Sequence, residues 1–274
     1  MVADLHLHTT YSDWTLDPDE LVAAMSEAGF NTIAITDHDN IDGIGEAMEA
    51  GAKLGLEVIP GVEFSAEYQH NEVHILGYFI DHKAQWFIDW LKDRQKKRLQ
   101  RIEKIVSRLD ECGIKVDVSK VFEAAIGGSA GRPHVAQILE QEGLVSSIKE
   151  AFDRFLRHGA PAYVPHFRLT PLEVAKIIHK SGGLAVIAHP GVANIDHLIP
   201  DFAVDGIDGL EVFYSAHNEA QVEKYKRLAR KFGLLMTGGS DYHGTSGMKK
   251  AEIGSVKLGD DYVNRLKKAA KDKV

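Results

Sequence analysis

Short apolar runs alternate with longer amphipathic segments along most of the chain. Seven runs rich in Val, Ile and Leu have the length of buried strands, at residues 4–8, 32–36, 57–65, 73–80, 184–188, 209–213 and 234–238. Several are separated by segments of helical period that open on Asp-Pro, Thr-Pro or Asn and end close to a glycine, at residues 17–28, 170–180 and 218–231. This alternation is typical of a parallel sheet covered by helices, so we predict an α/β fold in the form of a barrel.

The alternation is interrupted once, between residues 82 and 165, where only helical periodicity is present. Three- and four-residue steps give the first part of this segment one apolar face, made of Trp86, Phe87, Trp90, Leu91, Ile102, Ile105, Val106 and Leu109. Further helical patterns cover residues 118–125, 133–141 and 147–157. We therefore predict a helical subdomain at 82–165, inserted into a discontinuous barrel domain of residues 1–81 and 166–274.

The composition of the 274 residues, 44% hydrophobic and 26% charged, is that of an ordinary globular protein. A net charge of −8 gives no reason to expect stable binding to duplex DNA, and no apolar run is long enough to cross a membrane. The single cysteine, Cys112, cannot form an internal disulfide, and the N-terminal residues do not resemble an export signal, so we expect a cytoplasmic protein. The 14 histidines are the one unusual feature.

Histidines and carboxylates gather at the ends of the predicted strands. His6 and His8 stand two residues apart, so on a strand both side chains point to the same face. Taken alone, this pair also fits a strand with one solvated face. However, five further strands end or begin at His38, Glu63, His74, His189 and the Asp241–His243 segment. Since a parallel α/β barrel presents its functional residues at the carboxyl ends of its strands, we expect these side chains to meet at one rim.

Nitrogen and oxygen ligands without sulfur favour divalent ions such as Mn²⁺, Zn²⁺ or Fe²⁺ and argue against a structural zinc site built from cysteines. Six histidines and three carboxylates exceed what one ion can use, so we expect two or three ions, with Mn²⁺ as the first candidate. One carboxylate must then bridge two ions, and Glu63 is the best placed.

These motifs together resemble the PHP (polymerase and histidinol phosphatase) superfamily. The resemblance rests on DLHLHTTYSD at 4–13, TDHDN at 36–40, GVEFS at 61–65, His74, AHPG at 188–191 and GSDYH at 239–243. It implies a distorted (β/α)7 barrel with a trinuclear metal site. Carried over to this sequence, it implies a first site of His6, His8, Glu63 and Asp241, a second of Glu63, His74 and His189, and a third of Asp13, His38 and His243.

Such a cluster suits the hydrolysis of phosphate esters. Two neighbouring ions hold a bridging water as hydroxide near neutral pH and neutralise charge on the phosphoryl group. We expect this metal-bridging water, held by Glu63 and the neighbouring ligands, to attack phosphorus directly, while the third ion anchors the phosphate or the leaving group. The sequence assigns no general acid.

Substrate recognition is predicted at the segment Gly131-Arg132-Pro133-His134. The planar fork of Arg132 suits a phosphate, and Pro133 is typical of a helix N-terminus, which favours anions. An ordinary junction between a loop and a helix is the alternative. Because the segment also resembles the phosphate-binding element of nucleotide phosphatases in the PHP superfamily, we predict that Arg132 and His134 bind substrate. Eight basic residues between Lys92 and Arg108 either guide a polyanionic substrate or form a solvated helix face.

The function predicted from these features is that of a metal-dependent phosphoesterase acting on phosphate monoesters of nucleotides. We expect the substrate to be a nucleotide or a short oligonucleotide and the activity to be that of a 3′,5′-bisphosphonucleotide phosphatase or a 5′-to-3′ exonuclease on short RNA. Histidinol-phosphate phosphatase and a non-catalytic, metal-binding PHP module, as found within polymerases, are alternatives. An amidohydrolase-like barrel cleaving C–N bonds is a further alternative, but it is expected to carry a metal-bridging lysine, and no lysine stands at these strand ends.

Overall fold

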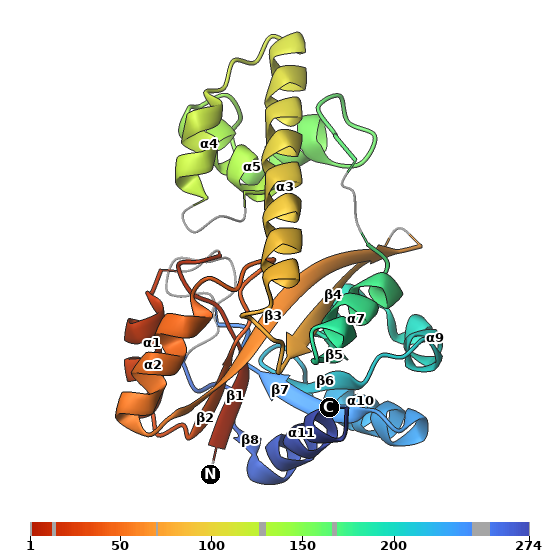
Figure 1. Ribbon diagram of the computed structural model, residues 1–274. Coiled ribbons are helices and arrows are strands. Elements are labelled where there is room, and N and C mark those ends of the chain that lie inside the picture. Colours follow the sequence, from red (N-terminus) through yellow and green to blue (C-terminus); the bar gives the residue numbers. More distant parts are fainter. Residues whose placement is uncertain are drawn as a thin grey trace. The chain divides into compact units, whose positions relative to one another are not determined.

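A computed structural model describes residues 2–12, 15–69, 71–125, 130–165, 169–242 and 253–273 of the chain. It divides into two compact units (Figure 1). One consists of residues 1–88 and 168–274 and contains the sheet, and the other consists of residues 89–167 and is helical in its described part.

The first unit is built on an eight-stranded sheet with the order β7-β6-β5-β4-β3-β2-β1-β8. Its strands are β1 (Val2–Leu7), β2 (Thr32–Ile35), β3 (Glu57–Tyr68), β4 (Asn71–Tyr78), β5 (Leu184–Ile187), β6 (Gly209–Tyr214), β7 (Leu235–Gly239) and β8 (Leu258–Gly259). Beyond β7 the chain returns to β1, where the backbone N–H of Asp241 donates to the carbonyl of His6 at 3.0 Å. The sheet is therefore a nearly closed barrel, which confirms the predicted α/β barrel and all seven predicted strands.

The expectation of a wholly parallel sheet is wrong at two strands. Strand β4 runs antiparallel to both β3 and β5, and β8, which the sequence did not predict, pairs antiparallel with β1. The reason at β4 is the link to β3, which pairs Tyr68 with Asn71 and leaves only two residues between them. A parallel pair needs a crossover of a dozen or more residues. As a result, the beginning of β4 lies at the same rim as the carboxyl ends of the parallel strands.

Helices of this unit lie on the outside of the sheet and at its ends (Figure 1). They are α1 (Pro18–Glu27), α2 (Ile44–Leu54), α7 (Pro171–Lys180), α8 (Pro190–Ala193), a 3₁₀ turn (Asp196–Leu198), α9 (Ile199–Val204), α10 (Glu219–Phe232) and α11 (Asp260–Lys273). The predicted caps form at α7 and α10, where Thr170 Oγ1 accepts from the Glu173 N–H and Asn218 Oδ1 from the Gln221 N–H. Within the described residues, no helix is long and apolar enough to cross a membrane.

Two hydrophobic layers hold this unit together. Ala34 of β2 packs in one cluster with Leu76 of β4 and Leu266 of α11. Its neighbours Ile33 and Ile35 pack in another cluster with side chains of α1. Successive residues of β2 thus face opposite sides of the sheet, as a strand requires. Because apolar side chains fill these layers, the polar residues are left at the rim.

The second unit is helical throughout its described residues. It contains most of α3 (Gln85–Glu111), then α4 (Val118–Ala124), α5 (Arg132–Gln141), α6 (Ile148–Ala151) and a π-helical turn (Phe152–Leu156). Its own buried cluster includes Ile102, Ile105 and Leu109 of α3 together with Val135 and Leu139 of α5. The three- and four-residue spacing of apolar residues along α3 therefore marks a face that packs against the other helices of this unit.

Candidate metal centre

Several predicted metal ligands lie in chain segments that follow a strand and run beside a neighbouring strand. His38 forms a bridge with Glu63 of β3, because the Asp39 N–H donates to the Glu63 carbonyl at 2.9 Å. The Ala188 N–H donates to the carbonyl of His74 at 2.9 Å, which brings His189 beside β4. Asp241 is held beside His6 in the same way. These extensions of the sheet collect side chains from distant parts of the sequence at one rim.

Two features of the backbone allow this close approach. His189 and Asp241 adopt left-handed conformations, with φ of 28° and 50°, which are costly for residues other than glycine and tend to cluster at functional sites. At Gly239 a Cβ atom would lie 2.3 Å from His6 Cβ, so only glycine lets the end of β7 pack this tightly against β1.

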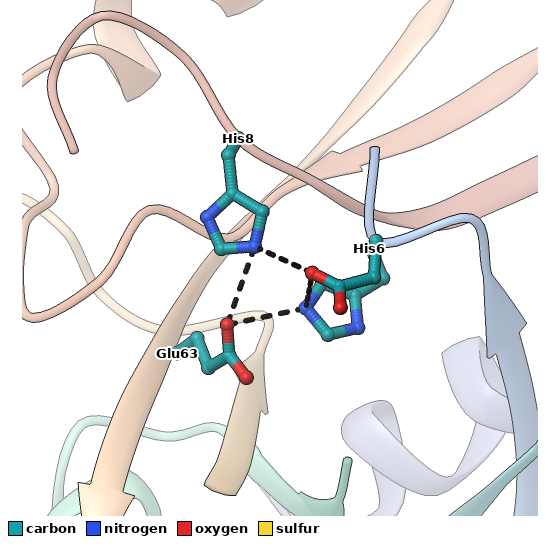
Figure 2. Close-up of side chains that lie close together, drawn as sticks. His6, His8 and Glu63 are labelled. Atoms are coloured by element: carbon teal, nitrogen blue, oxygen red, sulfur yellow. Dashed lines mark hydrogen bonds and ion pairs between the residues drawn. The ribbon is translucent and has the colours of Figure 1, made fainter. Parts of the chain in front are cut away.

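Glu63 is fully buried at the centre of the cluster. Its Oε2 lies 3.2 Å from the Nε2 atoms of both His6 and His8 (Figure 2). The remaining contacts of this carboxylate are Oε2 with His38 Nδ1 at 3.3 Å, and Oε1 with His74 Nδ1 at 2.8 Å and His189 Nε2 at 3.2 Å. A single carboxylate therefore touches five imidazoles, as expected of a ligand shared between ions.

Asp241 completes a group of four. Its Oδ1 lies 3.4 Å from His6 Nε2 and 3.3 Å from His8 Nε2, and all four residues, including Glu63, are buried. Zinc–nitrogen and zinc–oxygen bonds place the ligand atoms of a tetrahedral ion roughly 3.3–3.6 Å apart. The spacing of these four donor atoms fits one divalent ion, and so does their chemistry.

A second group shares Glu63. Ligand atoms of His38, Glu63 and His74 lie within 4.8 Å of one another, and His189 reaches the same carboxylate. His38 thus lies beside residues of the predicted second site. Its predicted partners in the third site, Asp13 and His243, lie outside the described residues, so the third site stays a prediction.

The charges of the cluster are mutually dependent. Burial raises the pKa of the Glu63 carboxyl, but His38, His6 and His74 hold that pKa well below its usual value. Burial lowers the pKa of His6, whereas Glu211, Glu63 and Asp241 together raise it well above its usual value. Burial also lowers the pKa of His74, but Glu63 and Glu72 together outweigh it and raise this pKa to about 9. The carboxylates thus favour positive charge on the rings, and divalent cations can supply that charge in place of protons.

Comparison with known proteins agrees with this geometry. The model of the PHP domain matches residues 4–162, which is more than half of the chain. The chain belongs to the PHP domain family. It is 35% identical over 250 residues to the 5′-3′ exoribonuclease Rnm of Escherichia coli, covering 89% of this chain and 85% of that protein. It is 32% identical to the 3′,5′-nucleoside bisphosphate phosphatase of Chromobacterium violaceum, covering 88% and 86% of the two chains.

The fold of this PHP domain also matches solved structures. One from Bifidobacterium adolescentis, described as a metal-dependent phosphoesterase, superposes with a TM-score of 0.81 at 30% identity and covers 96% of this chain and 94% of its own. These findings confirm the resemblance stated from the sequence motifs. They also confirm the predicted class of enzyme, a metal-dependent hydrolase of phosphoric esters.

The PHP domain contains supporting residues that the sequence motifs did not single out. Glu211 of β6 is fully buried, and its Oε1 lies 3.0 Å from His6 Nδ1. The hydroxyl of Tyr214 donates to Asp241 Oδ2 at 2.9 Å. A signal for Glu211 was available, since this charged residue stands between Leu210 and Val212 inside a predicted apolar strand.

The two predicted substrate-binding residues lie in the helical unit. The Arg132 guanidinium lies over the rings of Phe152 and Tyr163, 5.8 and 5.7 Å from their centroids, and Nη1 donates to the Leu156 carbonyl at 3.3 Å. His134 Nδ1 accepts the Gly131 N–H at 3.1 Å. These contacts are those of a helix start packed into its own unit, and the binding of phosphate by Arg132 and His134 stays a prediction.

Several basic residues of α3 have structural partners. Arg94 lies over the ring of Trp90 at 5.1 Å, and Lys97 pairs with Asp93 at 2.6 Å. Arg101 Nε donates to the Val164 carbonyl at 3.0 Å, and Arg108 donates to the carbonyl of Tyr163. The two arginines tie α3 to the last described segment of the helical unit, which accounts for part of the basic run without a substrate.

Proposed function

We propose that the protein hydrolyses phosphate esters of nucleotides, either phosphate monoesters as a 3′,5′-bisphosphonucleotide phosphatase or the phosphodiester bonds of short RNA as a 5′-to-3′ exonuclease. The observation that carries the proposal is the single buried carboxylate of Glu63 surrounded by five imidazoles at one rim of the barrel. The names of the exoribonuclease and bisphosphate phosphatase relatives support the nucleotide substrate.

In this proposal the rim holds two or three divalent ions, with Mn²⁺ as the first candidate and Zn²⁺ or Fe²⁺ as alternatives. His6, His8, Glu63 and Asp241 hold one ion, and Glu63, His74 and His189 hold a second, while Asp13, His38 and His243 are proposed for a third. When bound, such ions supply an activated water and offset the charge of the phosphoryl group.

The protein's own part is to hold these ligands in place before substrate arrives. His6 and His8 are fully buried, and Asp241 is fixed through both its backbone and its side chain. A ligand set held by buried contacts loses little freedom when ions bind, so the ions stay at defined positions relative to substrate. Arg132 and His134 are proposed to add a grip on a phosphate of the nucleotide.

A comparison of substrates tests the proposal. Mn²⁺-loaded protein is assayed for phosphate release from adenosine 3′,5′-bisphosphate and histidinol phosphate, and for mononucleotide release from a 5′-phosphorylated RNA of a few nucleotides. The proposal expects kcat/KM for the bisphosphate or the RNA to exceed that for histidinol phosphate. Preference for histidinol phosphate identifies the alternative phosphatase, and no hydrolysis with bound metal identifies a non-catalytic module.

His179→Ala is the matched control for removal of a rim histidine in these assays. His179 lies on α7, where its Nε2 contacts Asp208 Oδ2 at 2.7 Å, and it contributes nothing to the ligand groups. If substrate hydrolysis falls in His8→Ala and persists in His179→Ala, the reaction depends on the ligands at the rim.

A further inference from the structure

We infer that Glu211 is a positioning residue that fixes which ring nitrogen of His6 faces the metal centre, and that Ser12 does the same for His8. This inference rests on the proposed metal centre and adds to it the residues behind the ligands. In each imidazole Nε2 faces Glu63, and the inference concerns the other ring nitrogen, Nδ1.

Glu211 receives two donors on its two oxygens. Oε1 lies 3.0 Å from His6 Nδ1, and Oε2 accepts the backbone N–H of His189 at 2.7 Å. An ionised carboxylate only accepts hydrogen bonds, so the hydrogen of a neutral His6 ring belongs on Nδ1. The lone pair of Nε2 then points to Glu63 and Asp241, at 3.2 and 3.4 Å. This is the ring form that a metal requires, and metal-bound histidines commonly donate their other N–H to a carboxylate.

A carboxylate is the side chain that this position requires. Glu211 and the His6 ring are both fully buried, so the Nδ1–H of His6 cannot turn to bulk water instead. Glutamine has the same shape but only one acceptor oxygen, and it would direct an NH₂ group at either His6 Nδ1 or the His189 N–H. One carboxylate thus orients a ligand from β1 and the backbone of a ligand after β5.

His8 is oriented through a hydroxyl. The hydroxyl of Ser12 donates its only hydrogen to Asp37 Oδ1 at 2.5 Å, and the same Oγ lies 3.4 Å from His8 Nδ1. Asp37 also accepts from the backbone N–H and the hydroxyl of Thr9, both at 2.7 Å. With its hydrogen used on Asp37, the Ser12 oxygen can only accept from His8 Nδ1. The Nε2 of His8 is therefore left to face Glu63 Oε2 and Asp241 Oδ1, as in His6.

The test compares Glu211→Gln with Asp208→Asn. Asp208 is a close match, because its Oδ2 also accepts from a histidine ring and a backbone N–H, those of His179 and Ala185, each at 2.7 Å. His179, however, is not a predicted ligand. Zn²⁺ affinity is measured by competition with a chelating dye. We expect Glu211→Gln to weaken Zn²⁺ binding about 10- to 100-fold, as loss of a partner behind a ligand does elsewhere. Asp208→Asn should leave the affinity unchanged even where it lowers the melting temperature.

A spectroscopic readout separates orientation of the ring from general loosening. In Zn²⁺-loaded protein labelled with ¹⁵N-histidine, the proton on His6 Nδ1 should resonate far downfield because its acceptor is a carboxylate. It should move upfield in Glu211→Gln and stay in place in Asp208→Asn. Ser12→Ala, a smaller change, should weaken Zn²⁺ binding without moving the His6 signal.

Three results overturn the inference. The inference is contradicted if Glu211→Gln and Ser12→Ala both bind Zn²⁺ as tightly as the wild-type protein. It is also contradicted if Asp208→Asn loses as much Zn²⁺ affinity as Glu211→Gln. If Glu211→Gln does not fold, Ser12→Ala decides by affinity alone. Wild-type protein that binds no Zn²⁺ overturns the proposed metal centre as well, whereas wild-type binding with unaffected variants overturns only the positioning role.

Discussion

The hydroxyl of Tyr214 holds Asp241 by its Oδ2, at 2.9 Å, and so leaves Oδ1 to face the Nε2 atoms of His6 and His8. Tyr214 comes from the end of β6 and Asp241 from the segment after β7. Burial, together with Asp241, raises the pKa of Tyr214, so this side chain remains a hydrogen-bond donor. The bond therefore selects which oxygen of Asp241 is presented to the predicted metal ion.

Tyr214→Phe tests this relationship. A hydrogen bond to a charged group contributes about 1.5–3 kcal/mol, so Mn²⁺ affinity should fall by roughly 10- to 150-fold when Asp241 loses this bond. The matched control is Tyr225→Phe in α10, since the pKa of Tyr225 is likewise raised by burial and by a hydrogen bond to Asp196. An equal loss of Mn²⁺ affinity in the two variants would show that the Tyr214 bond has no specific role in the site.

Removal of either histidine of the first site should remove metal and leave the fold. Because His6→Ala or His8→Ala takes one of four converging donors from the rim, we expect hydrolysis to be lost and the content of bound Mn²⁺ to fall. The far-ultraviolet circular dichroism spectrum should not change. Full activity in a variant that has lost its metal would contradict a metal-centred reaction.

Arg132→Ala separates recognition of nucleotides from the general chemistry. If Arg132 grips a phosphate that the metals do not hold, its loss should lower kcat/KM for a nucleotide about 10- to 150-fold and affect p-nitrophenyl phosphate much less. Metal content should stay constant. Arg154→Ala controls for loss of a basic side chain in the same unit, because Arg154 lies over Phe155 and pairs with Glu150. No loss on either substrate would leave Arg132 as a structural residue of the helix start.

The stability of the protein should depend on pH through the ionisation of Asp208. Burial raises the pKa of this carboxyl, but hydrogen bonds from His179, Lys273 and the Ala185 N–H outweigh it and hold the pKa below the usual 3.8. A group whose pKa is lowered by folding stabilises the protein above its unfolded pKa, and this stabilisation is lost as the pH falls through the folded value.

Asp208→Asn should therefore lower the free energy of unfolding by about 1–2 kcal/mol at pH 7, and by progressively less below pH ~4. Urea unfolding of both proteins at several pH values measures the difference. Glu57→Gln is the control, since Glu57 pairs with Lys267 but has a side chain nearly half exposed. A difference that stays constant down to pH ~3 would contradict the role of Asp208.

Much of the fold follows from the sequence because its apolar runs are buried on both sides of the sheet. Ile33, Ala34 and Ile35 are all fully buried, so β2 reads as an unbroken apolar run. The direction of β4 was not predicted, because periodicity carries no information on strand direction. The short link between Tyr68 and Asn71 does carry it, and it requires an antiparallel hairpin.

The candidate site was predictable where a ligand stands at or within a few residues of the end of an apolar run, as His38, Glu63 and His189 do. Side-chain direction within β1 was not predictable, because regular alternation along a strand would place Leu5 and Leu7 on the same face. The register of β1 shifts between Asp4 and Leu7, and Leu5 packs in the cluster with α11 whereas Leu7 packs in the cluster with α1. Glu211 was missed because its partners, His6 and His189, become its neighbours only once the barrel closes.

Hydrolysis of adenosine 3′,5′-bisphosphate, measured as Mn²⁺ is titrated into metal-depleted protein, tests the central claim most directly. Bound Mn²⁺ is counted by elemental analysis at each point, with Glu63→Gln measured in parallel. We predict that phosphate release is absent without metal, rises as two or three ions bind, and does not return in Glu63→Gln, whose amide cannot serve two ions as the carboxylate does. Phosphate release by metal-free protein, or full activity of Glu63→Gln, would contradict the account.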